Sequence, residues 1–245
     1  MKISGFSYGH NLVESGYPFV EAIRSVQNFV DELVFVDCQS TDGTRKILDK
    51  LDVRVIDGHW GGAAGVTLAN AHTLNTNCEN DLILHFEADE IYEPRLIKGM
   101  IERQAHSKEM YNFGCYRLQL ELNFQRCRWY PEPVHRMFKR GTVKKEGHTT
   151  NCHKQAVIMP MENGLLWDIT NCFKNHWVKR TENQAKLWGN APSKNFVPKH
   201  FKEKTEVENM EEFMNEDFWH WRETPFKIPD ILKPLVGHAS YRPRV

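Results

Sequence analysis

Three carboxylates crowd into residues 87–90, where Glu87, Asp89 and Glu90 are interrupted only by Ala88. The apolar run 82–86 that precedes them is typical of a buried strand. Like charges held close together repel one another, and carboxylate oxygens are the ligands that hard divalent cations prefer. The segment therefore indicates a cation site directly after a strand. If the chain stays extended there, Glu87 and Asp89 point to the same side.

A second acidic segment follows another apolar run, residues 33–36. Asp37 ends that run, and Ser-Thr-Asp-Gly-Thr follows at residues 40–44, with Asp42 in the middle. This order of residues is typical of a tight turn that caps a helix, and for the segment alone this structural interpretation is the simpler one. The functional interpretation is that Asp37 or Asp42 accepts a hydrogen bond from a nucleotide base or ribose.

The elements around these segments alternate in type. Apolar runs predict strands, and helical spacing of apolar residues predicts helices between them. The strands are expected at 2–7, 33–36, 53–56 and 82–86, and the helices after Pro18 and at 41–51, 62–74 and 94–104. This rhythm predicts an α/β protein with a parallel sheet covered on both faces. Ligands bind beyond the carboxyl ends of such strands, so both acidic segments should share one edge.

Beyond residue 112 the pattern changes. Alternation over 113–124 predicts a longer strand with one solvated face, with shorter strands at 134–139 and 155–159. Two further helices are expected, at 179–188 and 206–221. No linker indicates a second independent domain.

Composition narrows the class of protein. The 245 residues carry 32 Lys plus Arg against 32 Asp plus Glu, which argues against a broad surface that coats nucleic acid. The six cysteines form no CxxC pair, so we expect buried thiols in a reducing compartment. The first residues turn polar too soon for a signal peptide, and no apolar run could span a bilayer. These features predict a cytoplasmic protein.

The segments LVFVDCQSTDGTRKIL and LILHFEADE together resemble the nucleotide-binding half of a GT-A glycosyltransferase, most closely family 2. The resemblance covers residues 1–94, continues through RMFKR at 136–140 and ends at NHWVKR, residues 175–180. It implies a Rossmann-like, mostly parallel central sheet with helices on both faces. It also implies a catalytic domain over 1–180, with a nucleotide-sugar-binding half at 1–110 and an acceptor half at 111–180. Residues 181–245 would form a helical C-terminal extension packed on the same domain.

The resemblance also implies roles for single residues. Asp89 and Glu87 would bind Mn²⁺ or Mg²⁺, and His176 would be a further ligand, which favours Mn²⁺ because imidazole is softer than oxygen. The donor, by resemblance a UDP-sugar, would contact a wider set of residues: Asp37, Asp42, Asn70, Glu87, Ala88, Asp89 and Arg136.

Two departures from the family pattern matter. The acidic motif is Glu-Ala-Asp rather than Asp-x-Asp, so Glu87 could lie behind the metal rather than on it. Ala69 stands where many relatives have Arg, which leaves the diphosphate to Arg136, Lys139 or Arg140. The catalytic base stays open, and the candidates are Glu146, His148, Asp168 and Glu132.

We therefore expect a metal-dependent glycosyltransferase that moves a sugar from a nucleoside-diphosphate donor to an acceptor hydroxyl, with inversion. The acceptor stays open between a glycan, a lipid-linked sugar and a modified nucleic acid. One alternative is a nucleotidyltransferase, but the N-terminal SGFSYGHN lacks the basic residue of its phosphate loop. The other alternative is a non-catalytic nucleotide- or glycan-binding module of the same fold.

Overall fold

The structure is a computed structural model. It describes residues 1–60, 77–107, 112–121, 126–128, 132–146, 149–152, 156–172, 221–223, 227–236 and 241–243. Within these ranges, no helix combines the length and the apolar character that crossing a membrane requires.

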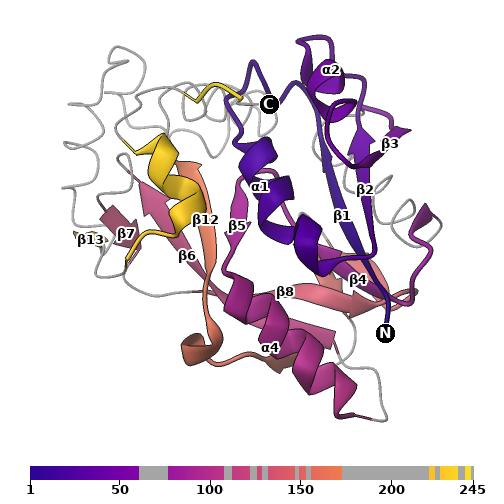
Figure 1. Ribbon diagram of the computed structural model, residues 1–245, viewed down its shortest axis with the longest axis vertical. Coiled ribbons are helices and arrows are strands. Elements are labelled where there is room, and N and C mark those ends of the chain that lie inside the picture. The colour runs from indigo at the N-terminus through magenta and orange to yellow at the C-terminus, as the bar shows by residue number, and fades with distance from the viewer. Residues whose placement is uncertain are drawn as a thin grey trace.

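Four parallel strands form the first part of the main sheet (Figure 1). In spatial order they are β3 (Arg54–Asp57), β2 (Glu32–Asp37), β1 (Ile3–Gly9) and β4 (Leu82–His85). The first and last residues of each strand lie within two residues of the limits predicted from the sequence. Because the strands are parallel, their carboxyl ends meet at one edge, which confirms the predicted α/β class and the placement of both acidic segments.

Antiparallel strands continue the sheet beyond β4. β8 (Glu132–Lys139) runs antiparallel to β4, and β6 (Asn112–Glu121) runs antiparallel to β8. The remaining strands of the sheet are short: β5 (Glu90–Tyr92), β7 (Arg126–Arg128), β11 (Ala156–Ile158), β12 (Leu166–Asn171) and β13 (Trp221–Glu223). A separate hairpin pairs β9 (Val143–Glu146) with β10 (Thr149–Cys152). The sheet is thus parallel in its first part and mixed in its second.

The helices begin where local chemistry favours it. α1 (Phe19–Val26) follows Pro18, and α4 (Pro94–Ala105) has its proline in the first turn, where the missing N–H costs nothing. α2 (Thr44–Leu48) is shorter than the predicted 41–51, because Gly43 at φ 96° places the preceding residues in the turn. Short 3₁₀ helices occur at η1 (Gln27–Phe29), η2 (Met161–Asn163) and η4 (Asp230–Leu235). The helices predicted at 62–74 and 179–188 lie outside the described residues. Of the helix predicted at 206–221, only Trp221 is described, and it begins β13.

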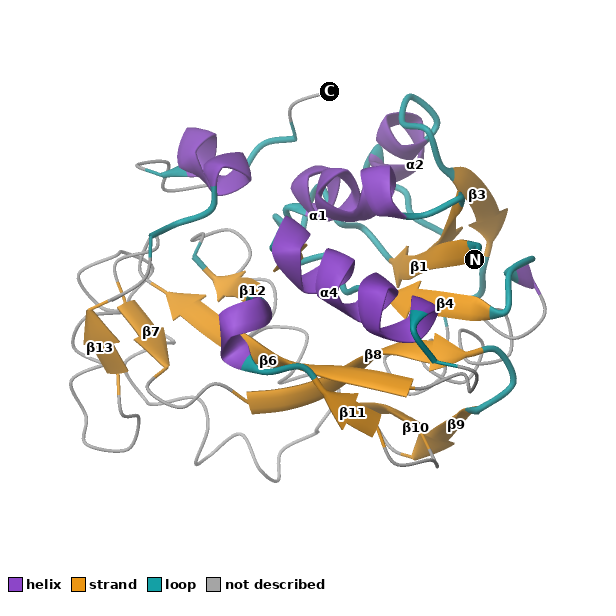
Figure 2. Cartoon of the chain, turned by 60° about the horizontal axis from the view of Figure 1, so that its bottom comes forward, coloured by secondary structure: helices purple, strands orange, loops and turns teal. Residues whose placement is uncertain are grey.

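Alternation along the strands divides the core between the two faces of the sheet. Leu33 and Leu84 belong to the larger cluster, under α1 and α4, which lie over the same face (Figure 2). Val34 and Ile83, one residue along each strand, belong to a smaller cluster with Phe138 on the opposite face. Four cysteines are buried and free, as expected: Cys38, Cys78, Cys115 and Cys172.

Part of the C-terminal region packs against α1. Leu232 and Leu235 of η4 are buried in the larger cluster, and η4 contacts α1. The buried hydroxyl of Tyr241 donates a hydrogen bond to Oε2 of Glu21 in α1, at 2.7 Å. η4 and Tyr241 are therefore attached to the first helix of the chain, whereas β13 pairs with β7.

Candidate active site at the carboxyl edge of the sheet

Residues 87–90 form a hydrogen-bonded turn, which we call the acidic turn. The Glu90 N–H donates to the Glu87 carbonyl at 3.1 Å, and the Glu87 N–H donates to Glu90 Oε2 at 3.1 Å. The expectation of an extended chain at Glu87 and Asp89 is therefore wrong, because the Glu90 side chain folds back onto the first amide. Ala88 and Asp89 are the two central residues of the turn, and both are buried.

Neighbouring strands hold the acidic turn on both sides. The Phe86 N–H donates to the Phe6 carbonyl of β1 at 3.0 Å, and the Ile169 N–H of β12 donates to the Asp89 carbonyl at 2.9 Å. The buried Tyr92 hydroxyl donates to the His85 carbonyl at 2.7 Å, closing the base of the loop. The acidic turn is thus attached to strands from both parts of the chain.

Arg136 in β8 supplies the positive charge that the acidic turn requires. Its Nε and Nη2 donate to the two oxygens of Glu90 at 2.8 and 2.6 Å, and Nη2 also donates to Glu87 Oε1 at 3.0 Å. Burial opposes the charge on Arg136, but Glu90 and Glu87 outweigh it and raise the pKa of Arg136 further above its ordinary value. Glu90 is fully buried, whereas 43% of the Glu87 side chain is exposed. A guanidinium therefore neutralises part of the cluster that the sequence assigns to a metal.

A β-bulge directs Arg136 toward the acidic turn. On β8, His135 lies opposite Gly114 and Met137 lies opposite Phe113, so Arg136 is an extra residue with no partner on β6. Bulges of this kind re-aim a side chain and often occur beside active sites. A Cβ on Gly114 would lie 3.0 Å from the Val134 carbonyl oxygen, so glycine permits the close approach of these strands.

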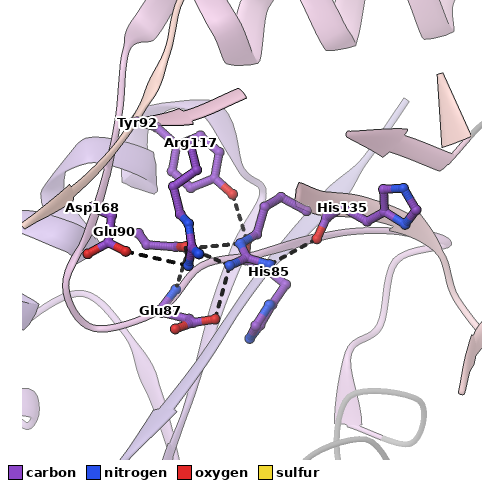
Figure 3. A network of polar contacts seen from close by, with 8 residues as sticks. His85, Glu87, Glu90, Tyr92, Arg117, His135 and Asp168 are labelled. Atoms are coloured by element: carbon purple, nitrogen blue, oxygen red, sulfur yellow. Dashed lines mark hydrogen bonds and ion pairs between the residues drawn. The ribbon is translucent and has the colours of Figure 1, made fainter. Parts of the chain in front are cut away.

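Arg117 and Asp168 extend the network (Figure 3). Nη1 of Arg117 lies 3.4 Å from Asp168 Oδ2 and 3.9 Å from Glu90 Oε1. Asp168 on β12 is paired directly with Glu90 on β5. The structure therefore brings Asp168, one of the predicted base candidates, beside the acidic turn.

His85 is the unexplained polar residue of this region. It is buried, and neither ring nitrogen has a hydrogen-bond partner among the described residues. Its ring stacks on Tyr8 with centroids 6.0 Å apart. Burial, and secondarily the charge of Arg136, lower the pKa of His85 to about 3, so the imidazole is neutral.

The two aspartates after β2 differ in their surroundings. Asp42 uses both oxygens within the loops: Oδ1 accepts the Thr44 N–H at 3.0 Å and Oδ2 accepts the Glu14 N–H at 2.6 Å. Asp37, at the end of β2, accepts the Ser40 N–H at 3.3 Å. The interpretation as a tight turn therefore accounts for Asp42, and Asp37 is buried at the end of β2.

An aromatic pair lies at the same edge, after β1 and β3. The rings of His10 and Trp60 stack with centroids 4.2 Å apart and 12° between their planes. His10 Nδ1 lies 2.7 Å from the Cys38 carbonyl oxygen, and Gln39 Oε1 accepts the Trp60 N–H at 3.2 Å. Trp60 is 37% exposed, so it contributes an apolar surface beside Asp37 rather than core packing.

The other predicted site residues are distributed as follows. Asn70, His148 and His176 lie outside the described residues. Two residues are described only as backbone positions: Glu146 at the end of β9 and Glu132 at the start of β8. Lys139 lies opposite Leu82, and Arg140 donates its N–H to the Asp81 carbonyl at 2.7 Å. Lys139 and Arg140 therefore lie at the amino end of β4. The predicted diphosphate contact requires the carboxyl end, so the prediction is wrong for these two residues. Of the three basic residues considered, only Arg136 reaches the acidic turn.

Sequence reasoning missed the roles of Glu90, Arg117 and His85. A signal for Glu90 was present, because a carboxylate that opens the apolar strand Glu90–Tyr92 must find a buried partner. The bulge that selects Arg136 as this partner depends on strand register, which the sequence does not display.

Comparison with known proteins places these residues in a family. The family model described as Glycosyl transferase family 2 matches residues 18–161, well over half of the chain. An uncharacterized glycosyltransferase of Rickettsia felis is 40% identical over 89 residues, which are 36% of this chain and 29% of that protein. One from Rickettsia typhi is 39% identical over 104 residues, 42% of this chain and 34% of that protein. The chain spans about a third of the length of these curated relatives.

Two solved structures show a more distant similarity. Staphylococcus aureus TarS 1–349 is 21% identical, with a TM-score of 0.36 and coverage of 49% of this chain and 36% of that one. Glucosyl-3-phosphoglycerate synthase from Mycobacterium tuberculosis, solved with Mn²⁺ and UDP-glucose, is 17% identical, with a TM-score of 0.38 and coverage of 47% and 43%.

Proposed function

We propose that this chain, which belongs to glycosyl transferase family 2, transfers a sugar from a nucleoside-diphosphate donor to an acceptor hydroxyl with the help of a divalent cation. The observation that carries the proposal is the acidic turn at the carboxyl end of β4, on the same sheet edge as Asp37 at the end of β2. Ligands of parallel α/β sheets bind at this edge.

The nucleotide would lie over the ends of β1, β2 and β3. Asp37 is proposed to accept a hydrogen bond from the base or ribose, and Trp60, stacked on His10, offers an apolar surface beside it. Uridine diphosphate is the favoured nucleotide on the family resemblance. Asn70 is proposed to contribute from outside the described residues.

Asp89 and Glu87 would hold the cation. Both are carboxylates on one short turn, which suits Mn²⁺ or Mg²⁺, and Glu87 Oε1 already bears a hydrogen bond from Arg136. Among the described residues, no three His, Cys, Asp or Glu side chains converge as a complete metal site. The cation is proposed to take its further ligands from the donor's phosphates and from His176. When bound, the cation would stabilise the negative charge of the departing diphosphate.

The acceptor hydroxyl requires a base. Asp168 is proposed as this base because it is paired with Glu90 across β12 and β5, and Glu146 and His148 are retained as further proposals. An in-line displacement with inversion, on a glycan, a lipid-linked sugar or a hydroxyl of a modified nucleic acid, completes the proposed reaction.

A donor panel tests the proposal. Nucleotide sugars would be offered with Mn²⁺ or Mg²⁺ and a mixture of acceptors, and released nucleoside diphosphate would be measured. Asp89→Asn should abolish release while the unfolding transition stays in place. The matched control is Asp81→Asn, because Asp81 lies just before the other end of β4 and pairs with Arg140 at 3.1 Å. Normal turnover in Asp89→Asn would exclude the assigned role.

The two aspartates after β2 should separate binding from stability. Asp37→Asn should weaken uridine diphosphate binding in calorimetry with little effect on unfolding. Asp42→Ala should lower the free energy of unfolding by about 0.5–1.5 kcal/mol, because it removes the acceptor of the Thr44 and Glu14 N–H groups, with nucleotide affinity retained. The reverse pattern would assign the nucleotide contact to Asp42.

A further inference from the structure

The buried pair Glu90–Arg136 requires an explanation. Glu90 is fully buried and Arg136 is 5% exposed, so folding removes both charges from water. Replacing such a pair by well-packed apolar residues is often neutral or stabilising. Glu90 opens a strand whose next residues, Ile91 and Tyr92, are buried and apolar, so an apolar residue would suit its position. Stability alone therefore does not account for the pair.

The contacts of the pair point to the acidic turn. Glu90 accepts the Glu87 N–H, and Arg136 Nη2 bonds Glu87 Oε1 at 3.0 Å. One residue of the pair thus fixes the backbone of Glu87 and the other fixes its side chain. The bulge at Arg136 exists within an otherwise regular pairing of β6 and β8, and it directs the guanidinium to this point.

We infer that Glu90 and Arg136 are positioning residues that hold the acidic turn in its cation-binding shape before the cation arrives. The inference rests on the proposed function of the turn. Arg136 stays on Oε1 of Glu87, which leaves the half-exposed carboxylate its second oxygen for the cation. Partners behind a metal ligand orient it, and their loss typically weakens metal affinity about 10- to 100-fold.

The same arrangement explains how three carboxylates share four residues without a metal. Arg136 lies between Glu90 and Glu87 and balances the charge of the turn in the free protein. The cation therefore does not have to assemble the turn, and its binding energy is not spent on ordering the backbone.

The decisive experiment removes both charges together. A double variant, Glu90→Leu with Arg136→Met, deletes the pair without leaving a lone buried charge, so it should unfold close to the wild-type urea midpoint. Mn²⁺ binding is measured by the electron paramagnetic resonance signal of free Mn²⁺, with and without uridine diphosphate. We expect at least a tenfold loss of Mn²⁺ affinity in the double variant.

Two further variants complete the test. Arg136→Lys keeps the charge but cannot bond Glu90 twice and Glu87 at once, so it should also lose Mn²⁺ affinity even if the double variant fails to fold. The control pair is Glu32→Gln with Arg54→Met, because Glu32 and Arg54 form an ion pair at 3.0 Å at the amino end of the same sheet. This control should leave Mn²⁺ affinity unchanged.

The outcomes separate the inference from the proposed function. Wild-type Mn²⁺ affinity in a folded double variant, or in Arg136→Lys, would show that the pair is only structural and would overturn the inference. Absence of Mn²⁺ binding in the wild type would overturn it as well. If the wild type binds Mn²⁺ and the variants lose it while no donor is turned over, the positioning role stands and the proposed reaction fails.

Discussion

Replacing His85 by Phe should change the pH dependence of stability in a way that the structure allows us to calculate. The folded protein keeps this buried imidazole neutral, with a pKa of about 3, whereas the unfolded chain takes up a proton near pH 6.5. Between these values the unfolded state binds more protons, so the free energy of unfolding falls as the pH falls. The slope approaches about 1.4 kcal/mol per pH unit, which gives a loss of about 2 kcal/mol between pH 7.5 and pH 5.

In His85→Phe this contribution should disappear. Phe also removes two buried nitrogens that lack partners among the described residues, and any packing cost of the larger ring applies equally at every pH. At each pH, the free energy of unfolding of the wild type is subtracted from that of the variant. The value obtained at pH 7.5 is then subtracted from the value obtained at pH 5. It should be about 2 kcal/mol in favour of the variant.

Urea unfolding at the two pH values, in EDTA to exclude divalent cations, supplies the four free energies. His59→Gln is the control for losing a histidine as such, because His59 is exposed. If His85→Phe and wild type lose the same free energy between pH 7.5 and pH 5, then His85 is not the buried neutral group that the structure shows.

Two other substitutions test contacts outside the acidic turn. Tyr241→Phe removes the donor to the buried carboxylate of Glu21 and should lower the free energy of unfolding by about 1–3 kcal/mol; a change below the error of urea unfolding would show that the tail is not attached to α1. Gly114→Ala would place a Cβ 2.4 Å from Ile158 Cδ1 and 3.0 Å from the Val134 carbonyl oxygen. This overpacking should cost about 1–3 kcal/mol, seen as a lower Tm, and an unchanged Tm would contradict the close approach of β6 and β8.

The parallel part of the sheet could be predicted because its signals are local. Apolar runs and intervening helical spacing are each contained in a few residues, and the carboxyl-edge rule then placed Asp37 and the acidic turn together. Pro94 marked the start of α4 for the same reason, since its effect depends only on the first helical turn. The limits of α2 were less well predicted, because a left-handed Gly43 decides where it begins.

The details of the site could not be predicted because they depend on register. Glu90 and Arg136 are 46 residues apart, and they meet only because β8 lies antiparallel to β4 and carries a bulge. The carboxylates were therefore expected to be neutralised by a metal alone, although the guanidinium of Arg136 supplies part of the positive charge. Because β8 is antiparallel to β4, Lys139 lies at the amino end of β4 and not at the carboxyl end, where the diphosphate contact was expected.

The shared sheet also limits how this chain could be recombined with a relative. A chimera that joined residues 1–107 of this chain to the later residues of a relative would separate β4 from β8 and β5 from β12. The new partner would have to supply an arginine in the same bulge and an amide for the Asp89 carbonyl. The residues before and after the 108–111 gap are therefore expected to fold as one unit, so that exchanging either part requires compensating substitutions in the other.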